Sequence, residues 1–213
     1  MAAEKQNCMI IGAAPITKEL LQEFAPKDHF IICADAGYEQ ALKLGVTPDL
    51  IVGDFDSAEK EPPKNIRTLT LPIHKDVTDT MFAAMRGLAK GLRAFVLLGC
   101  LGGERMDHSI ANIEVLLFLR EHGAQGFLAR EHTRLFLLRE EKLKMTKMKG
   151  ATVSVFPYCG PNCTVTYNGL EYPLQYGTLT CGGMRMGVSN SVVEDLAEIR
   201  VHSGTALVVV YQP

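Results

Sequence analysis

The chain has 213 residues, a formal net charge of −2 and a hydrophobic fraction of 47%, which together favour one large or two small packed domains. The pI near 6.3 gives no basic footprint for nucleic acid, and no apolar run is long enough to span a membrane. The polar segment 1–7 lacks the apolar stretch of a secretory signal, and the six cysteines match no familiar zinc pattern. A reduced protein of the cytoplasm is the simplest interpretation.

Short apolar strands alternate with helices along the first part of the chain. Strands are expected at residues 8–12, 30–34, 50–52, 66–71, 94–98, 126–129 and 134–138. Helices are expected at residues 17–24 and 38–44, after residue 79 and after residue 107. This alternation predicts an α/β domain, residues 1–138, with a Rossmann-like, mainly parallel sheet and helices on both faces.

Apolar residues at helical spacing predict which faces of the last two helices are buried. The first of these faces comprises Met81, Ala84, Met85, Leu88 and Leu92. The second comprises Ile110, Ile113 and Leu117.

The pattern changes after about Arg139. The charged segment 140–149 is expected to bridge two domains. Beyond it we expect short strands at residues 151–156, 163–167, 170–174, 197–201 and 206–211. Asn168-Gly169 is a strong hairpin signal among them. Residues 139–213 are therefore expected to form a small all-β sandwich.

Two aspartates follow the expected strand 50–52. Gly53 frees the backbone to turn, and Asp54 and Asp56 are one residue apart, so both carboxylates can face one point while Phe55 faces the core. Such a pair suits Mg²⁺, and the metal would hold a polyphosphate. The alternative is an acidic surface turn, because aspartate is common in turns.

Further charged groups follow other expected strands. Asp35 follows the strand 30–34, either as an N-cap or as a metal or phosphate ligand. Lys75, Thr78 and Asp79 stand at a helix start, where phosphate is attracted. The alternative is ordinary capping by Asp76 or Thr78 with Lys75 in solvent, and an acid such as Asp79 is common in a first turn anyway. Because ligands bind beyond the carboxyl ends of parallel strands, these groups are expected at one edge of the sheet.

The segment 102–108 combines glycines with charged residues ahead of a helix. Gly102 and Gly103 let backbone amides approach a phosphate, and Arg105 can bind phosphate oxygens bidentately. Asp107 could cap the helix, orient Arg105 or bind a ligand hydroxyl. His108 is either a phosphate contact or a structural hydrogen-bonding group. Neither a P-loop nor a dinucleotide fingerprint is present.

In order along the chain, these stretches resemble the thiamine pyrophosphokinase (thiamine diphosphokinase) family in its bacterial form. The matching stretches are Asp35-Ala36-Gly37, Pro48-Asp49, Gly53 to Ser57, Lys75 to Asp79, Gly102-Gly103, Arg105 to His108 and Ser189-Asn190. The resemblance implies an α/β catalytic domain, a β-sandwich that helps to bind thiamine, and a homodimer with active sites between subunits. It also implies transfer of a pyrophosphoryl group from ATP to the thiamine hydroxyl, giving thiamine diphosphate and AMP.

Each motif then receives a role by resemblance. The metal ligands for Mg²⁺ are expected to be Asp54, Asp56 and Asp79. The catalytic residues are expected to be these three with Lys75 and Asp107, and the ATP-binding residues Asp35, Thr78, Gly102, Gly103, Arg105 and His108. Thiamine is expected to contact Asp107, Ser189 and Asn190. The alternative for Ser189 and Asn190 is a polar turn.

Two other functions compete with the kinase. An Asp-x-Asp nucleotide-sugar transferase explains Asp54 and Asp56 but not the downstream motifs, and a catalytically silent thiamine or nucleotide sensor has no need of a complete metal site. The sequence leaves open which aspartate acts as the base, the number of metal ions, the kinetic order and the tolerance for thiamine analogues. The chain has no Trp, so a Tyr, Phe or Met must stack on thiamine.

Overall fold

The structure is a computed structural model that describes residues 5–55, 61–72, 76–184 and 187–213. It divides into two compact units, Met1–Glu131 and His132–Pro213. β7 (Thr133–Arg139) belongs to the second unit, because it pairs along its length with β14 (Thr205–Tyr211). No helix in the described part of the chain is both long and apolar enough to cross a membrane.

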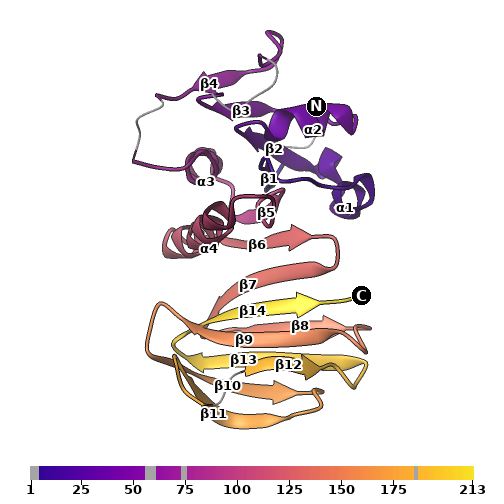
Figure 1. Ribbon diagram of the computed structural model, residues 1–213, viewed down its shortest axis with the longest axis vertical. Helices are drawn as coiled ribbons and strands as arrows, with labels where there is room; N and C mark the ends of the chain where they lie inside the picture. Colours follow the sequence, from indigo (N-terminus) through magenta and orange to yellow (C-terminus); the bar gives the residue numbers. More distant parts are fainter. Residues whose placement is uncertain (1–4, 56–60, 73–75, 185–186) are drawn as a thin grey trace. The chain divides into compact units, whose positions relative to one another are not determined.

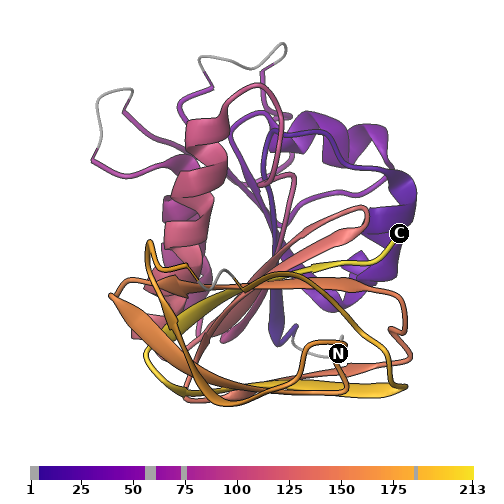
Figure 2. The same ribbon diagram turned by 60° about the horizontal axis from the view of Figure 1, so that its bottom comes forward.

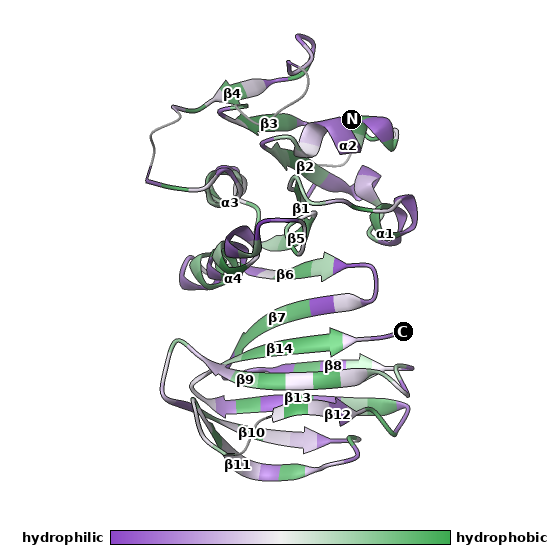
Figure 3. Ribbon diagram, viewed as in Figure 1, coloured by the Kyte–Doolittle hydropathy of each residue, from purple (hydrophilic) through white to green (hydrophobic). Residues whose placement is uncertain are grey.

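The first unit is built on a parallel sheet with the strand order β6-β5-β1-β2-β3-β4. Its strands are β1 (Asn7–Ile11), β2 (His29–Ala34), β3 (Leu50–Gly53), β4 (Thr68–Thr70), β5 (Ala94–Leu98) and β6 (Gln125–Arg130). The central strands are strongly apolar (Figure 3), as expected for strands that are covered on both faces. These strands lie within a few residues of the expected ranges.

Helices cover both faces of this sheet (Figure 1). They are α1 (Lys18–Glu23), the 3-10 turn η1 (Pro26–Asp28), α2 (Gly37–Lys43), α3 (Asp79–Ala89) and α4 (Met106–Glu121). Successive strand residues face opposite sides: Met9 and Ile11 share a core with α1 and α2, whereas Cys8 meets Gly87 of α3. The helices on both faces are therefore present as predicted.

The predicted buried face of α3 is wrong in part. Its buried residues are Ala83, Ala84 and Gly87, and Met85 is 40% exposed. A Cβ at position 87 would lie 2.6 Å from the ring of Phe95, so the small residues bring the helix onto the sheet. Close packing of small side chains decides the buried face here, not the hydrophobicity of the methionines.

The predicted buried face of α4 is wrong as well. Ile110 is 56% exposed, and the buried residues are Ser109, Asn112, Val115, Leu116 and Leu119. The two buried polar residues are hydrogen-bonded: Asn112 Nδ2 donates to the carbonyl of Cys100 at 2.9 Å, and Ser109 Oγ accepts from the backbone N–H of Gly102 at 2.9 Å. Figures 1 and 2 both show α3 and α4 side by side.

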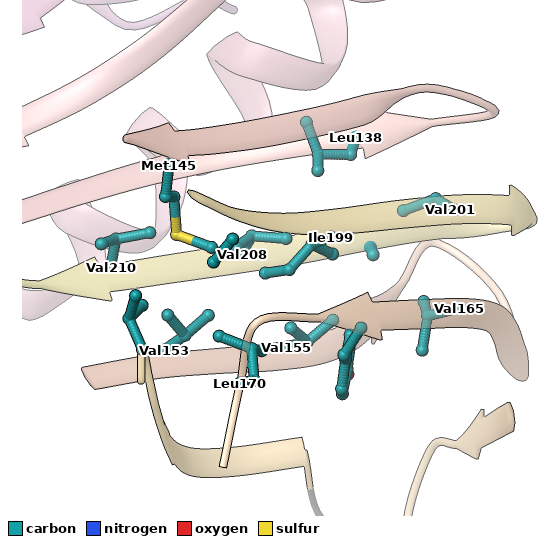
Figure 4. Close-up of a cluster of buried hydrophobic side chains, with 14 of the residues drawn as sticks. Leu138, Met145, Val153, Val155, Val165, Leu170, Ile199, Val201, Val208 and Val210 are labelled. Atoms are coloured by element: carbon teal, nitrogen blue, oxygen red, sulfur yellow. The ribbon is translucent and has the colours of Figure 1, made fainter. Parts of the chain in front are cut away.

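The second unit consists of two antiparallel sheets with the orders β12-β9-β14-β7 and β11-β10-β13-β8. Its other strands are β8 (Lys142–Thr146), β9 (Thr152–Tyr158), β10 (Asn162–Asn168), β11 (Leu174–Thr180), β12 (Gly187–Ser191) and β13 (Leu196–Ser203). Both sheets contribute to one buried cluster, which includes Val155 and Val208 from the first and Val165 and Ile199 from the second (Figure 4).

Three strands of the second unit differ from the sequence expectation. β8 lies where a charged linker was predicted: it is an edge strand whose Met145 is buried while Lys142 and Lys144 are exposed, and exposed lysines are typical of edges. β12 was read as a polar turn. The predicted strand 170–174 forms only an isolated bridge from Leu170 to Val192, and β11 begins where it was expected to end.

Candidate functional site

Asp35 and Asp54 follow adjacent parallel strands and lie at the carboxyl edge of the first unit's sheet. The backbone N–H of Asp35 donates to the carbonyl of Val52 at 2.8 Å. A Cβ at Gly53 would lie only 3.0 Å from the Cα of Asp35, so glycine permits this close approach. Asp35 has a φ of +50°, a backbone conformation that costs energy in a non-glycine residue and is common at functional sites.

Phe55 is directed to the interior, as predicted. Its ring packs against the apolar core of the first unit and meets the ring of Tyr38 edge-on, at 6.1 Å between centroids. Phe55 has a φ of +60°, which marks a sharp turn directly after Asp54. Asp56 lies outside the described residues, so its position relative to Asp54 is a prediction.

Asp79 begins α3 at the same edge of the sheet. The chain leaves β4 at the carboxyl edge, and the later residue Gly87 lies over Cys8 and Phe95, near the starts of their strands. Thr78 is the N-cap, and its hydroxyl accepts a hydrogen bond from the N–H of Met81 at 3.2 Å. The structure therefore gives Thr78 the capping role, and Lys75 lies outside the described residues.

The residues at this edge offer oxygen donors of the kind that a magnesium ion prefers. One carboxylate oxygen of Asp35 and one of Asp79 are buried, and carboxylate oxygen is the hard donor that Mg²⁺ prefers. In the described parts of the chain, no three acidic, His or Cys side chains are placed to share a metal ion. Asp56, one of the three predicted ligands, lies outside those parts of the chain.

The glycine-rich segment after β5 is held against α4. Gly102 and Gly103 have φ angles of 82° and 79°, which glycine adopts without strain. Ser109 binds the N–H of Gly102, which fixes the loop to the helix. Arg105 stands at the N-cap position without a side-chain cap, and His108 is exposed.

Arg105 and Asp107 form a bidentate ion pair. Nε of Arg105 donates to Oδ1 of Asp107 at 2.9 Å, and Nη2 donates to Oδ2 at 2.6 Å. Of the three roles considered for Asp107, the structure shows the orientation of Arg105. The hydrogen bonds and charge of Arg105 lower the pKa of Asp107 to about 2, with a smaller contribution from His108.

We expect Arg105→Ala to raise the pKa of Asp107 from about 2 toward the ordinary value of about 3.9, because its main hydrogen-bond donor is lost. Because the pKa of Asp107 is lower in the folded than in the unfolded state, the ion pair stabilises the folded state at pH values above about 3.9. This stabilisation is lost as the pH falls through about 2. Carboxyl NMR titration measures the shift. The control Arg93→Ala removes an arginine that binds the carbonyls of Leu88 and Leu92 and should leave the pKa unchanged.

Arg130 is a residue that the sequence reading missed. It ends β6, and a Cβ at Gly102 would lie 2.5 Å from its Nη1, so its guanidinium occupies the space that the glycine leaves open. Arg130 also pairs with Glu131 at 3.3 Å. The sequence feature that could have identified Arg130 is its position directly after the expected strand 126–129.

The second unit contains a pocket of about 410 Å³, a size typical of small-molecule sites. Buried apolar residues form its floor, and Tyr172, Pro173 and Val188 lie at its exposed rim. The full lining comprises Val153, Val155, Tyr167, Leu170, Tyr172, Pro173, Leu174, Leu179, Gly187, Val188 and Asn190. Of the predicted pair, Asn190 belongs to this lining.

The Asn190 amide holds the backbone of Tyr172. Asn190 Oδ1 accepts from the N–H of Tyr172 at 3.0 Å, and its Nδ2 donates to the carbonyl of Tyr172 at 2.8 Å. Asn190 is 7% exposed, whereas Tyr172 is 65% exposed. Asn190 therefore positions Tyr172, a largely exposed aromatic residue of the pocket lining that was not identified from the sequence.

Ser189 is exposed and strained. Its φ is +58°, and its N–H donates to Ser154 Oγ at 3.1 Å. The pairing of β12 with β9 shifts register between Gly187 and Asn190, so a bulge lies at Ser189. Such irregularities re-aim side chains near binding sites.

Comparisons with known proteins agree over most of the chain. The family model "Thiamin pyrophosphokinase, catalytic domain" matches residues 21–128, and "Thiamin pyrophosphokinase, vitamin B1 binding domain" matches residues 139–207. The chain is 25% identical over 232 aligned positions to "Thiamine pyrophosphokinase 3" of Oryza sativa subsp. japonica, with 91% of this chain and 84% of the relative covered.

Solved structures share the fold at lower identity. Thiamine pyrophosphokinase from Bacillus subtilis superposes with a TM-score of 0.85 at 21% identity, covering 97% of this chain and 99% of the other. Thiamin pyrophosphokinase from Candida albicans gives a TM-score of 0.80 at 17% identity, covering 98% and 90%. The fold therefore extends over both units.

Proposed function

This chain belongs to the thiamin pyrophosphokinase family, and from that premise we propose how its residues carry out the reaction. It is a thiamine diphosphokinase, which transfers a pyrophosphoryl group from ATP to the hydroxyl of thiamine and releases AMP. The observation that carries this function is the match of the two family models, one within each unit. The sensor and the nucleotide-sugar transferase are not favoured, because neither explains both matches.

We assign ATP and Mg²⁺ to the carboxyl edge of the first unit. Asp54, Asp56 and Asp79 would hold the metal, with Asp35 beside them, and bound Mg²⁺ would neutralise charge on the phosphate oxygens. Phosphoryl-type transfer asks the protein chiefly for positioning and charge stabilisation. The placement of Asp35, Asp54 and Asp79 at strand and helix ends of one edge supports this assignment.

Cationic and backbone groups of the same unit would bind the triphosphate. Gly103 would offer its amide ahead of α4, whereas the N–H of Gly102 donates to Ser109 Oγ, so Gly102 would contribute through the close approach that it permits, with Arg130 against it. Lys75 would neutralise a phosphate, and Arg105 would do so in the orientation that Asp107 gives it. His108 remains a further candidate contact, exposed one residue beyond that pair.

The second unit would bind the rings of thiamine in its apolar pocket. Tyr172 is the side chain that we propose to stack on thiamine, because it is a largely exposed aromatic residue of the pocket lining and Asn190 fixes its backbone. Ser189 would meet polar atoms of the substrate from the adjacent bulge. Asn190 would then act through Tyr172, not by direct contact with thiamine.

Incubation with ATP, Mg²⁺ and thiamine tests the function directly. The expected products are AMP and thiamine diphosphate in equal amounts, resolved by ion-pair chromatography. ADP with thiamine monophosphate would instead identify an ordinary monophosphate kinase, and binding of thiamine without any product would favour the sensor.

We also propose a homodimer with active sites at the subunit interface. Its support is apolar surface on two packed helices: Met85 of α3 is 40% exposed, and Met106 and Ile110 of α4 are 72% and 56% exposed. The hydropathy colours show apolar residues on α4 beside polar ones (Figure 3). Exposed apolar side chains that gather in this way mark interaction surfaces.

Ile110→Glu is expected to weaken this dimer at least ~10-fold, about 1.4 kcal/mol, the scale of one interface hot spot. Sedimentation velocity against concentration measures the dissociation constant. Gln22→Glu, which adds the same charge to an exposed position of α1, is the control. An unaltered chain that sediments as a monomer at micromolar concentration, or a variant with unchanged affinity, would contradict the proposal.

Finer features of the fold and location are also proposals. The parallel sheet with helices on both faces supports a Rossmann-like first domain, and the core shared by two antiparallel sheets supports a β-sandwich. The six cysteines, which all lie in the described part of the chain, form no disulfide there, which supports a reducing compartment such as the cytoplasm.

A further inference from the structure

Tyr167 is a buried polar residue in the wall of the second unit's pocket. It is 5% exposed and lines the pocket opposite Leu174, with which it pairs between β10 and β11. Its hydroxyl is buried and has no hydrogen-bond partner in the described parts of the chain. A hydroxyl in such a place loses its hydrogen bonds to water without replacement, which costs free energy. A hydrogen-bond acceptor brought by a ligand would remove this cost.

The other polar side chains of the pocket lining do not provide that partner. Asn190 binds the backbone of Tyr172, and its Oδ1 also accepts from the N–H of Ser191. Tyr172 is largely exposed at the rim. The remaining lining side chains are apolar, which leaves a ligand atom as the natural partner for the Tyr167 hydroxyl.

The strand pairing next to Tyr167 is irregular. The register of β10 with β11 shifts between Val165 and Tyr167, so that β11 carries an extra residue there. Tyr176, in this part of β11, has a φ of +49°. Bulges that are maintained at such a cost often aim a side chain at a binding site.

We propose that the Tyr167 hydroxyl donates a hydrogen bond to a ring nitrogen of the thiamine aminopyrimidine and thereby sets the specificity of the pocket. This inference rests on the proposed function, which places the thiamine rings in the pocket. A largely apolar pocket with a buried hydroxyl that has no partner in the described chain distinguishes a nitrogen heterocycle from a hydrocarbon ring of the same shape, because a ring without the nitrogen leaves that hydroxyl unpaired. Burial raises the pKa of Tyr167, so the hydroxyl keeps the proton that it donates.

Tyr167→Phe tests the proposal, because it removes the hydroxyl and keeps the ring. We expect the KM for thiamine to rise about 3- to 10-fold, the scale of one neutral hydrogen bond, while the KM for ATP stays unchanged. Thermal stability should be equal or higher, because an otherwise unpaired buried hydroxyl is gone. Tyr211→Phe makes the same change at a tyrosine that is 45% exposed on β14 and should change neither constant.

Two thiamine analogues, each with one pyrimidine nitrogen replaced by C–H, identify the ligand atom. For the analogue that lacks the bonded nitrogen, the unaltered chain and Tyr167→Phe should have equal KM values, because neither can form the hydrogen bond from the Tyr167 hydroxyl. A thiamine KM that is unchanged in Tyr167→Phe, with raised stability, would overturn this inference and leave the kinase intact. No product from the unaltered chain would overturn the proposed function, and this inference with it.

Discussion

Replacing Asp54 with alanine is expected to lower turnover at least ~100-fold while the fold remains intact. The carboxylate stands at the end of β3, beside Asp35 and at the edge where α3 begins at Asp79. Removing one principal electrostatic group from a preorganised site typically costs two to three orders of magnitude, about 2.7–4 kcal/mol. Single-turnover measurement of AMP release at saturating ATP and thiamine reports this loss.

Two control variants separate the metal role from general damage. Asp28→Ala removes an exposed aspartate just before β2, at the opposite edge of the sheet, and should leave turnover unchanged. Asp54→Asn keeps the shape and removes the charge, so it should resemble the alanine variant. Its residual activity should also require more Mg²⁺. Near-normal turnover in both Asp54 variants would reject the assignment.

The position of the site at the sheet edge was predictable from the sequence for a simple reason. Buried parallel strands are short apolar runs, and the residues that follow them must lie at one edge. Asp35, Asp54 and the loop that contains Gly102 could therefore be placed together before any coordinates. These residues could be placed without knowing how side chains pack, because the direction of each strand alone determines the sheet edge at which the next loop lies.

The individual roles of similar residues were not predictable in the same way. Asp49 and Asp54 lie in one stretch, yet Asp49 is structural: it accepts from the N–H of Ile31 at 2.8 Å and pairs with Lys5 at 2.8 Å. Thr78 likewise serves as a cap. Local sequence shows which groups are near an edge, whereas tertiary partners decide which of them remain available to a ligand.

The faces of α3 and α4 illustrate a second limit. Hydrophobic spacing favoured Met85 and Ile110 as core residues, but small residues and hydrogen-bonded polar ones are buried instead. The size of a helix's side chains limits how near the helix can pack to a sheet. Gly87 lets α3 pack close to Phe95 of β5. Apolar residues left on the surface then point to a partner, and the proposed homodimer would supply one.

Strands of the second unit depend even more on context. Lys142 and Lys144 made β8 look like a linker, although alternation with Leu143 and Met145 is present in the sequence. The polar segment of β12 is a strand because it pairs with β9, across a register shift at Ser189. β-propensity reflects packing against neighbours, and those neighbours are distant in the sequence.

Replacing Tyr172 with alanine is expected to raise the KM for thiamine about 10- to 100-fold with little change in the KM for ATP. Tyr172 lines the pocket and is 65% exposed, and the Asn190 amide holds its backbone in place. An aromatic side chain that stacks on a planar heterocycle contributes about 1–3 kcal/mol. Steady-state kinetics with each substrate varied in turn measure both constants.

Matched tyrosine variants make this test specific for stacking. Tyr172→Phe keeps the ring and should retain a near-normal thiamine KM, which would distinguish stacking from hydrogen bonding by the hydroxyl. Tyr211→Ala removes another exposed tyrosine of the same unit, which lies on β14 outside the pocket lining, and should leave both constants unchanged. Because Asn190 acts through Tyr172, Asn190→Ala should raise the thiamine KM in the unaltered chain but add little to Tyr172→Ala. Equal effects of Asn190→Ala in both backgrounds would show that Asn190 contacts thiamine independently.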